Sequence, residues 1–293
     1  MEIGDIDIKS LAEKVLATRY DHRDPLPPEP DYLIRIDGKG IALPGSIIGV
    51  YGPPKSRKSS LMGMIAAASL SEEGRFGTIE SKIKGDILWF DTEQSEMEVQ
   101  LFQNNVIKMS KVTDDDLILS KYYAMKLRPY DEMERLLVID KLITAPNLFN
   151  NIGLLILDGI ADLLYNVNEI EASKKLVTRL TQWADTLNVP LFVALHTNKD
   201  GKDATGSLGG FINKKASYAI KCEPEFDGGP STIRPYLTRL GQKFLPFMIT
   251  NDEDTGMPTY YDPNEALADL CWSEPAKKSI SNIENIEDAL DSL

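Results

Sequence analysis

Residues 47–60, I-I-G-V-Y-G-P-P-K-S-R-K-S-S, constrain the fold of this chain more than any other stretch. A short apolar run leads into Gly52, then Arg57, Lys58 and Ser59 follow, and an apolar helical pattern begins. Strand, tight loop and helix in this order are the context of a phosphate-binding loop, whose backbone N–H groups and helix N-terminus surround phosphates. The stretch predicts a nucleotide-binding α/β fold in which Lys58 reaches the phosphates and the Ser59 hydroxyl holds Mg²⁺.

The loop departs at one position from the usual pattern G-x-x-x-x-G-K-[ST], because Arg57 stands where the second glycine is expected. A side chain there makes left-handed backbone angles and close approach to a ligand costlier. The arginine could lie outward, add positive charge beside the phosphates, or block productive binding, and a chance match on an ordinary strand–turn–helix stays open. On the nucleotide interpretation, the residues expected to contact it are Gly52, Pro53, Pro54, Lys55, Ser56, Arg57, Lys58, Ser59 and Ser60.

Length and composition are those of an ordinary globular protein. With 293 residues, 42% of them hydrophobic, the chain can bury a sizeable core. No apolar run approaches the roughly 20 residues that span a bilayer, and the acidic start is no secretory signal, so we expect a cytoplasmic protein without membrane contact. Cys222 and Cys271, with two histidines, argue against a dedicated zinc site. The net charge of −13 argues against coating nucleic acid over the whole surface but permits a local basic loop.

The chain divides into three predicted regions. Residues 1–30 form an arm, in which helical spacing of apolar residues predicts an amphipathic helix at about 6–19 and a Pro-rich stretch makes a stiff connector. That helix either docks on a neighbouring subunit or packs on its own domain. Residues 31–262 form the nucleotide-binding domain. Residues 263–293 are an acidic, partly disordered tail, which is either a peptide for a partner or an inert solubilising segment.

Three further apolar runs share one feature, since each is followed at once by polar residues. They are I-L-W-F before Asp91-Thr92-Glu93, L-L-I-L before Asp158, and V-P-L-F-V-A-L before His196. The carboxyl ends of buried parallel strands meet at one edge of a sheet, where ligands bind, and a carboxylate there can hold the Mg²⁺ shell.

The other expected elements are a strand at 32–36, helices at 59–70, 96–110, 130–143 and 170–187, a polar loop at 71–85, extended pieces at 117–119 and 122–123, a long mobile loop at 197–215, a strand at 217–222, and a hairpin-like pair at 231–240 and 244–250.

This ordered set of motifs resembles the RecA-like ATPase superfamily, and it is most similar to hexameric helicases of the DnaB and plasmid RepA kind, found among AAA-family ATPases of phages and mobile elements. The resemblance covers about residues 32–262. It implies an α/β fold with a RecA-like P-loop core, a mostly parallel central β-sheet flanked by helices, and antiparallel strands at the C-terminal side. It also implies ATP and Mg²⁺ as cofactors, a homo-oligomer that forms a hexameric ring, and single-stranded DNA as partner. The tail lies outside the resemblance, and a replication protein is the candidate partner for it.

The resemblance assigns roles residue by residue. Glu93 matches the carboxylate that polarises the attacking water, Asp158 the acid of the metal shell, and His196 the residue that senses the γ-phosphate. Arg239, with which Lys243 could share the role, lies where the family places an arginine that completes a neighbour's site. In the loop at 197–215, the residues matched to DNA contact are Lys199, Lys202, Lys214 and Lys215.

Each role has an ordinary structural alternative. Glu93 could be a solvated acid, His196 a packed core histidine, the loop at 197–215 a plain surface loop, and Arg239 a solvated charge in a hairpin. The sequence thus favours an ATP-hydrolysing motor, an oligomeric helicase or translocase on single-stranded DNA. The alternatives are a nucleotide-gated protein that loads or regulates partners without unwinding, and a non-hydrolysing scaffold. A small-molecule kinase shares the loop, but no arginine-rich lid is evident.

Overall fold

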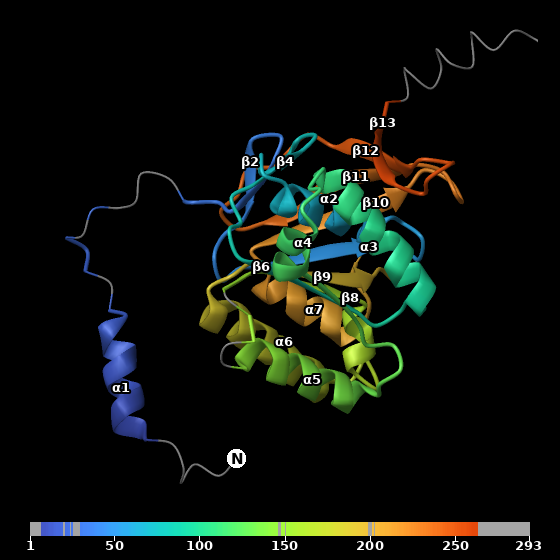
Figure 1. The fold of residues 1–293 in the computed structure, drawn as a ribbon. Helices are drawn as coiled ribbons and strands as arrows, with labels where there is room; N and C mark the ends of the chain where they lie inside the picture. Colours follow the sequence, from blue (N-terminus) through green and yellow to red (C-terminus); the bar gives the residue numbers. More distant parts are fainter. Residues whose placement is uncertain are drawn as a thin grey trace, which may run out of the picture. The chain divides into compact units, whose positions relative to one another are not determined.

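A mixed sheet organises the domain that follows the Pro-rich stretch (Figure 1). The computed structural model describes residues 7–19, 21–23, 25, 30–145, 148–149, 151–198, 201 and 203–262. Within these residues nine strands form this sheet, in the order β13-β12-β11-β10-β3-β9-β8-β6-β7. Their bounds are β3 (Ile47–Gly52), β6 (Asp86–Asp91), β7 (Tyr122–Lys126), β8 (Ile152–Asp158), β9 (Leu191–His196), β10 (Tyr218–Pro224), β11 (Ser231–Thr238), β12 (Phe247–Asn251) and β13 (Pro258–Tyr261).

The strands from β10 to β7 run parallel, whereas β11, β12 and β13 pair antiparallel beyond β10. Six-residue strands such as β3 and β6 are buried along their whole length, as expected for parallel strands covered on both faces. The expected α/β fold, with a mostly parallel sheet and antiparallel strands at its C-terminal side, is therefore confirmed.

Helices cover both faces of the sheet, as Figure 1 shows. One face carries α2 (Lys58–Leu70), α3 (Glu96–Ser110) and α4 (Asp115–Lys121), and the other carries α5 (Glu132–Thr144), α6 (Ile170–Leu187) and α7 (Gly206–Lys215). Successive residues of a strand point to opposite faces, so Trp89 packs into the first core, and Leu88 and Phe90 into the second. Four expected helices and the strand at 217–222 are confirmed, within a residue or two at their ends.

A small antiparallel sheet packs against α2. It has the order β2-β1-β5-β4, with β1 (Ile34–Ile36), β2 (Lys39–Ala42), β4 (Arg75–Phe76) and β5 (Ile79–Ser81). The strand expected at 32–36 is confirmed over its last three residues. The expectation of a plain loop at 71–85 was wrong, because the completely buried Ile79 anchors β5 beside β1.

The extended piece expected at 117–119 was also wrong, since these residues lie in α4. The Asp114 side chain accepts a hydrogen bond from the Leu117 N–H, which starts the helix, and Ile118 is the buried residue of its apolar triplet. A helix N-cap therefore decides the local structure, and the apolar triplet does not. The extended piece at 122–123 is confirmed as the start of β7.

The second half of the loop expected at 197–215 is a helix, α7. Leu208 and Ile212, four residues apart, are completely buried and give this helix its packed face. A Cβ on Gly209 would lie 2.5 Å from the backbone of Ala204, so this glycine permits close packing. The sequence predicts a mobile loop here, and tertiary packing overrides that expectation over residues 206–215.

The chain divides into two units, Met1–Asp31 and Tyr32–Leu293. In the first unit the expected helix is confirmed as α1 (Ile8–Ala17), which begins at Asp7, whose carboxylate accepts from the Ser10 N–H. The tail predicted at 263–293 lies outside the described residues. Among the described helices, none combines the length and the apolar character needed to cross a bilayer.

The core and the revised helix α4 can be tested with one matched pair of substitutions. Leu155 lies buried in the middle of β8, whereas Leu119 on α4 is 72% exposed. We expect Leu155→Ala to lower the free energy of unfolding by about 2–5 kcal/mol, because it leaves a cavity in the core. Leu119→Ala should change it by about 0.5 kcal/mol or less. Urea unfolding measures both, and similar losses would contradict the fold.

Candidate functional site

Four strand ends meet at one edge of the central sheet. The pairing of β3 with β9 sets Gly52 opposite His196, and the pairing of β6 with β8 sets Asp91 opposite Asp158. A cavity of about 520 Å³ opens at this edge. It is lined by Pro54, Lys55, Ser56, Arg57, Lys58, Ser59, Ser60, Glu93, Phe102, Asp158, His196, Gly228 and Asn251. The structure thus brings together most of the residues expected from the sequence to form a nucleotide site.

Close backbone contacts shape the loop between β3 and α2. A Cβ on Gly52 would lie 2.2 Å from the Ser56 hydroxyl and 2.3 Å from the Cys222 carbonyl oxygen, so only glycine fits there. Lys55 and Arg57 have left-handed backbones, with φ of 61° and 63°. The helix then starts at Lys58 and presents its N-terminus, with its N–H groups, to the cavity.

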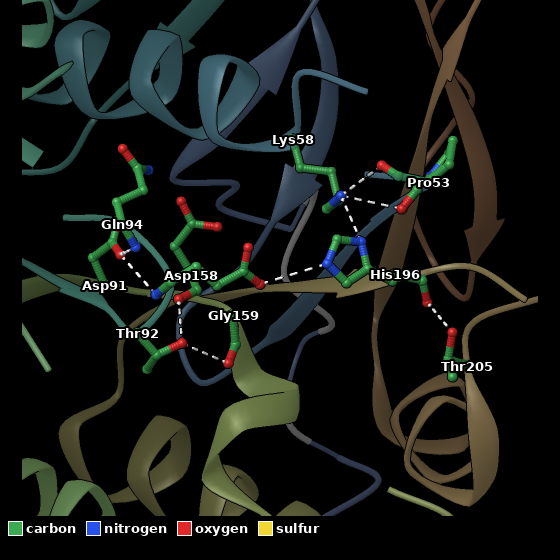
Figure 2. A network of polar contacts seen from close by, with 11 residues as sticks. Pro53, Lys58, Asp91, Thr92, Gln94, Asp158, Gly159, His196 and Thr205 are labelled. Atoms are coloured by element: carbon green, nitrogen blue, oxygen red, sulfur yellow. Dashed lines mark hydrogen bonds and ion pairs between the residues drawn. The ribbon is translucent and has the colours of Figure 1, made fainter. Parts of the chain in front are cut away.

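Lys58 is the buried cation of the site (Figure 2). Its ammonium group donates to the carbonyl oxygens of Gly52 and Pro53, at 3.1 and 2.9 Å, and lies 3.2 Å from His196 Nδ1. Gly52 and Pro53 therefore lie behind the cavity lining and hold Lys58 in place. Burial lowers the pKa of Lys58, which means that this charge is costly where it lies.

His196 links Lys58 to Glu93. An ammonium group can only donate, so His196 Nδ1 accepts and Nε2 carries the proton of the neutral ring. That nitrogen lies 3.6 Å from Glu93 Oε1. Contact with His196 holds the pKa of Glu93 below its ordinary value, so Glu93 is ionised near neutral pH. The three side chains form a continuous polar chain across the cavity.

Backbone contacts fix the segment that carries Glu93. Asp91 accepts from the N–H groups of Glu93 and Gln94, at 3.0 and 2.8 Å (Figure 2). The Thr92 hydroxyl donates to the carbonyl oxygens of Asp158 and Gly159, at 3.1 and 2.9 Å. The turn after β6 is therefore tied both to its own strand and to the end of β8.

The acids of the site carry an electrostatic cost. Burial is the main cause that raises the pKa of Asp158 to about 7; the nearby Asp91 and Glu93 contribute in the same direction, and a hydrogen bond with the Ser59 side chain opposes them. Burial also raises the pKa of Asp91. One carboxylate oxygen of Asp158 is buried without a hydrogen-bond partner among the described residues. Such an uncompensated oxygen is destabilising unless something else satisfies it.

The donor set at this point fits Mg²⁺. Ser59 and Asp158 supply a hydroxyl and a carboxylate, the hard oxygen ligands that Mg²⁺ prefers. Among the described residues, no group of three or more His, Cys, Asp or Glu could hold a metal ion. These oxygens therefore suit an ion that keeps several waters and binds together with phosphate oxygens, as Mg²⁺ does in nucleotide sites.

Arg57 lies in the cavity wall and contacts the turn between β10 and β11. Its guanidinium donates to the carbonyl oxygen of Gly229 and, at 3.3 Å, to that of Gly228, in the turn between β10 and β11. The left-handed φ of Arg57 is the conformation for which the usual pattern has glycine. The loop thus keeps the backbone shape of a phosphate-binding loop with a different residue.

Comparison with known proteins identifies the family. A family model described as an AAA domain matches residues 10–202, more than half of the chain. The chain belongs to the AAA domain family. Among solved structures it is similar in fold to one described as "Crystal structure of the RadB recombinase", with 16% sequence identity and a TM-score of 0.50, covering 76% of this chain and 93% of that chain. No curated protein matches.

The family and the fold together support the RecA-like P-loop ATPase interpretation of the sequence and its nucleotide binding. At such low identity, the likeness to the recombinase shows the fold alone. Neither comparison distinguishes the DnaB or RepA kind of helicase from other members of the superfamily.

Other predicted residues of this AAA domain protein lie away from the cavity. Arg239 follows β11, and its N–H donates to Ser217 beside the start of β3, so it lies at the opposite end of the sheet from the phosphate loop. Its guanidinium donates to the Lys214 carbonyl oxygen in the last turn of α7, where Lys215 also lies. The remaining two lysines matched to DNA contact, Lys199 and Lys202, lie outside the described residues.

Sequence reasoning did not assign roles to several residues at the site. Thr92 and Thr205 hold the strand ends: Thr205 donates through both its N–H and its hydroxyl to the His196 carbonyl oxygen (Figure 2). In the sequence Thr92 directly precedes Glu93, and a threonine hydroxyl at the end of a strand often donates to a nearby backbone carbonyl oxygen. Phe102 and Asn251 line the cavity from α3 and β12, and their long sequence separation from the loop left no signal.

The raised pKa of Asp158 makes a testable prediction about stability. The carboxyl binds its proton more tightly in the folded than in the unfolded chain, where the pKa is about 3.9, so stability is lost as the pH rises from about 4 to about 7. Asn cannot ionise, so Asp158→Asn should raise Tm at pH 8 by about 5 °C, corresponding to about 2 kcal/mol, and less at pH 5.

Differential scanning calorimetry without nucleotide or metal, at both pH values, measures this difference. The exposed Asp116→Asn serves as the control and should show no such pH dependence. An equal change for Asp158→Asn at both pH values would contradict the assignment of a costly buried carboxylate.

Proposed function

We propose that this protein hydrolyses ATP at the cavity between the phosphate loop and the ends of β6, β8 and β9. The observation that carries the proposal is the convergence of Lys58, His196 and Glu93, which come from three separate elements and form one polar chain. Electrostatic stabilisation and a positioned water are what phosphoryl transfer requires of a protein, since little covalent chemistry falls to it.

Each residue has a part that its environment supports. Glu93 is ionised and acts as the base that polarises the attacking water. Lys58 leaves the Gly52 and Pro53 carbonyl oxygens for the stronger phosphate acceptors, because charge-assisted hydrogen bonds to an anion are stronger than those to a carbonyl. When bound, Mg²⁺ would neutralise phosphate charge from a position held by Ser59 and Asp158.

His196 then senses the γ-phosphate. Departure of Lys58 takes away the hydrogen bond at His196 Nδ1, and the backbone of His196 is bonded to Thr205 at the start of α7. The isolated bridge of Thr197 with Ala204 closes the segment between them. A change at the histidine therefore has a short path to the segment after β9, which we propose contacts DNA.

We propose that hydrolysis drives the movement of a homo-oligomer on single-stranded DNA. The resemblance to hexameric helicases favours a ring of six subunits. Lys214 and Lys215, with Lys199 and Lys202, would meet the DNA phosphates. The position of Arg239 supports an oligomer, because it lies too far along the sheet to serve its own site and could complete a neighbour's. A replication protein could bind the acidic tail.

A second candidate is a nucleotide-gated protein that loads or regulates partners and unwinds nothing. The net charge of −13 favours it, because a strongly acidic protein repels the DNA backbone away from any local basic segment. Both candidates share the same ATP site and differ in what nucleic acid does to turnover.

The test is ATP turnover with and without single-stranded DNA, over a range of protein concentration, for wild type and Glu93→Gln. We expect wild-type turnover to rise with DNA and with concentration, and Glu93→Gln to lose about 10²–10⁴-fold, because the base is gone while nucleotide binding stays. Glu73→Gln, exposed and outside the cavity, is the control and should leave turnover unchanged.

The other outcomes are decisive as well. Turnover that ignores DNA would favour the loading or regulating protein over the motor. Full turnover by dilute monomer would show that Arg239 is not needed from a neighbour. Unchanged turnover in Glu93→Gln would overturn the assignment of the base.

A further inference from the structure

One guanidinium joins two parts of the nucleotide cavity that are far apart in sequence. Arg57 belongs to the phosphate loop. Gly228 and Gly229 lie in the turn between β10 and β11, and Ser231 is the first residue of β11. Two backbone carbonyl oxygens and, at 3.5 Å, the Ser231 hydroxyl surround the guanidinium. Because the fork of an arginine is rigid, such a set of contacts fixes the turn relative to the loop.

The contacts engage neutral acceptors only. Among the residues that the structure describes, no carboxylate pairs with Arg57, and its Nε is buried without a hydrogen-bond partner. Arg57 also holds a left-handed backbone, which is costly for any residue other than glycine. Arg57 thus has a strained backbone and a partly desolvated charge, and the hydrogen bonds of its guanidinium with the turn offset these two costs.

The turn that receives Arg57 is itself closely built. The N–H of Glu225 donates to the Pro230 carbonyl oxygen, and the N–H of Gly229 to that of Phe226, both at 3.0 Å. A Cβ on Gly229 would lie 2.5 Å from the Phe226 ring, so the ring packs directly on this glycine. Gly228 is the part of the turn that lines the cavity. Movement of the turn would therefore open the cavity wall.

We propose that Arg57 is a positioning residue that ties the turn at 225–230 to the phosphate loop and so slows the release of bound nucleotide. The inference rests on the proposed function, since it concerns the same cavity. It predicts that restoring the usual glycine weakens nucleotide retention, although glycine relieves the backbone strain. Lysine keeps the positive charge but lacks the planar guanidinium group. It should therefore keep only part of the contact with the turn.

The experiment uses the full-length chain with the fluorescent probe mant-ATP and Mg²⁺. Stopped-flow displacement by excess ATP gives the release rate, and hydrogen–deuterium exchange of peptides covering 225–231 reports the turn. For Arg57→Gly we expect about tenfold faster release and faster exchange of the turn even without nucleotide, because charged hydrogen bonds are lost and strain relief offsets part of the loss. Arg57→Lys should fall between Arg57→Gly and wild type.

Lys111→Gly is the matched control, since Lys111 also has a left-handed backbone, with φ of 60°, but lies exposed at the end of α3. It should leave both measurements unchanged. Fast release with unchanged exchange of the turn would show direct contact of Arg57 with the nucleotide and overturn the tie. Wild-type rates in Arg57→Gly would also overturn it. If wild type fails to bind mant-ATP, the proposed function itself is wrong.

Discussion

The parallel pairing of β3, β9, β8 and β6 is the constraint on which the rest of the structure depends. Their interiors are buried on both faces, so their polar residues can only lie where the strands end. Parallel pairing sends those ends to a single edge, and the phosphate loop leaves β3 at that edge as well. The site is thus a consequence of how the core is built.

That arrangement concentrates charge in a poorly solvated place. Lys58, Asp91 and Asp158 are all buried. Burial lowers the pKa of Lys58 and raises the pKa of both acids, so it favours the neutral form of each. The protein balances part of this cost with hydrogen bonds from the backbone and from Ser59. One oxygen of Asp158 stays uncompensated among the described residues, as expected for a site whose geometry serves a ligand more than stability.

The sequence predicted the fold class and the convergence of Lys58, Glu93, Asp158 and His196, because buried strands with polar ends leave a clear pattern. It missed what depends on packing between distant segments: Gly209 of α7 fits against Ala204, and Asn251 reaches the cavity from a late strand. The direction of Arg57 also depended on a turn 171 residues further on. Composition and spacing do not predict such contacts. A helix N-cap such as Asp114, by contrast, is a local signal that the sequence does contain.

The most direct test of the account is calorimetric titration of Mg·ATP into wild type, Lys58→Ala and Lys214→Ala. The account predicts saturable binding by wild type, about tenfold or more weakened in Lys58→Ala through loss of a charged contact, and unchanged in Lys214→Ala at the far end of the sheet. Equal binding by wild type and Lys58→Ala would contradict a nucleotide site at the edge where the four strands end.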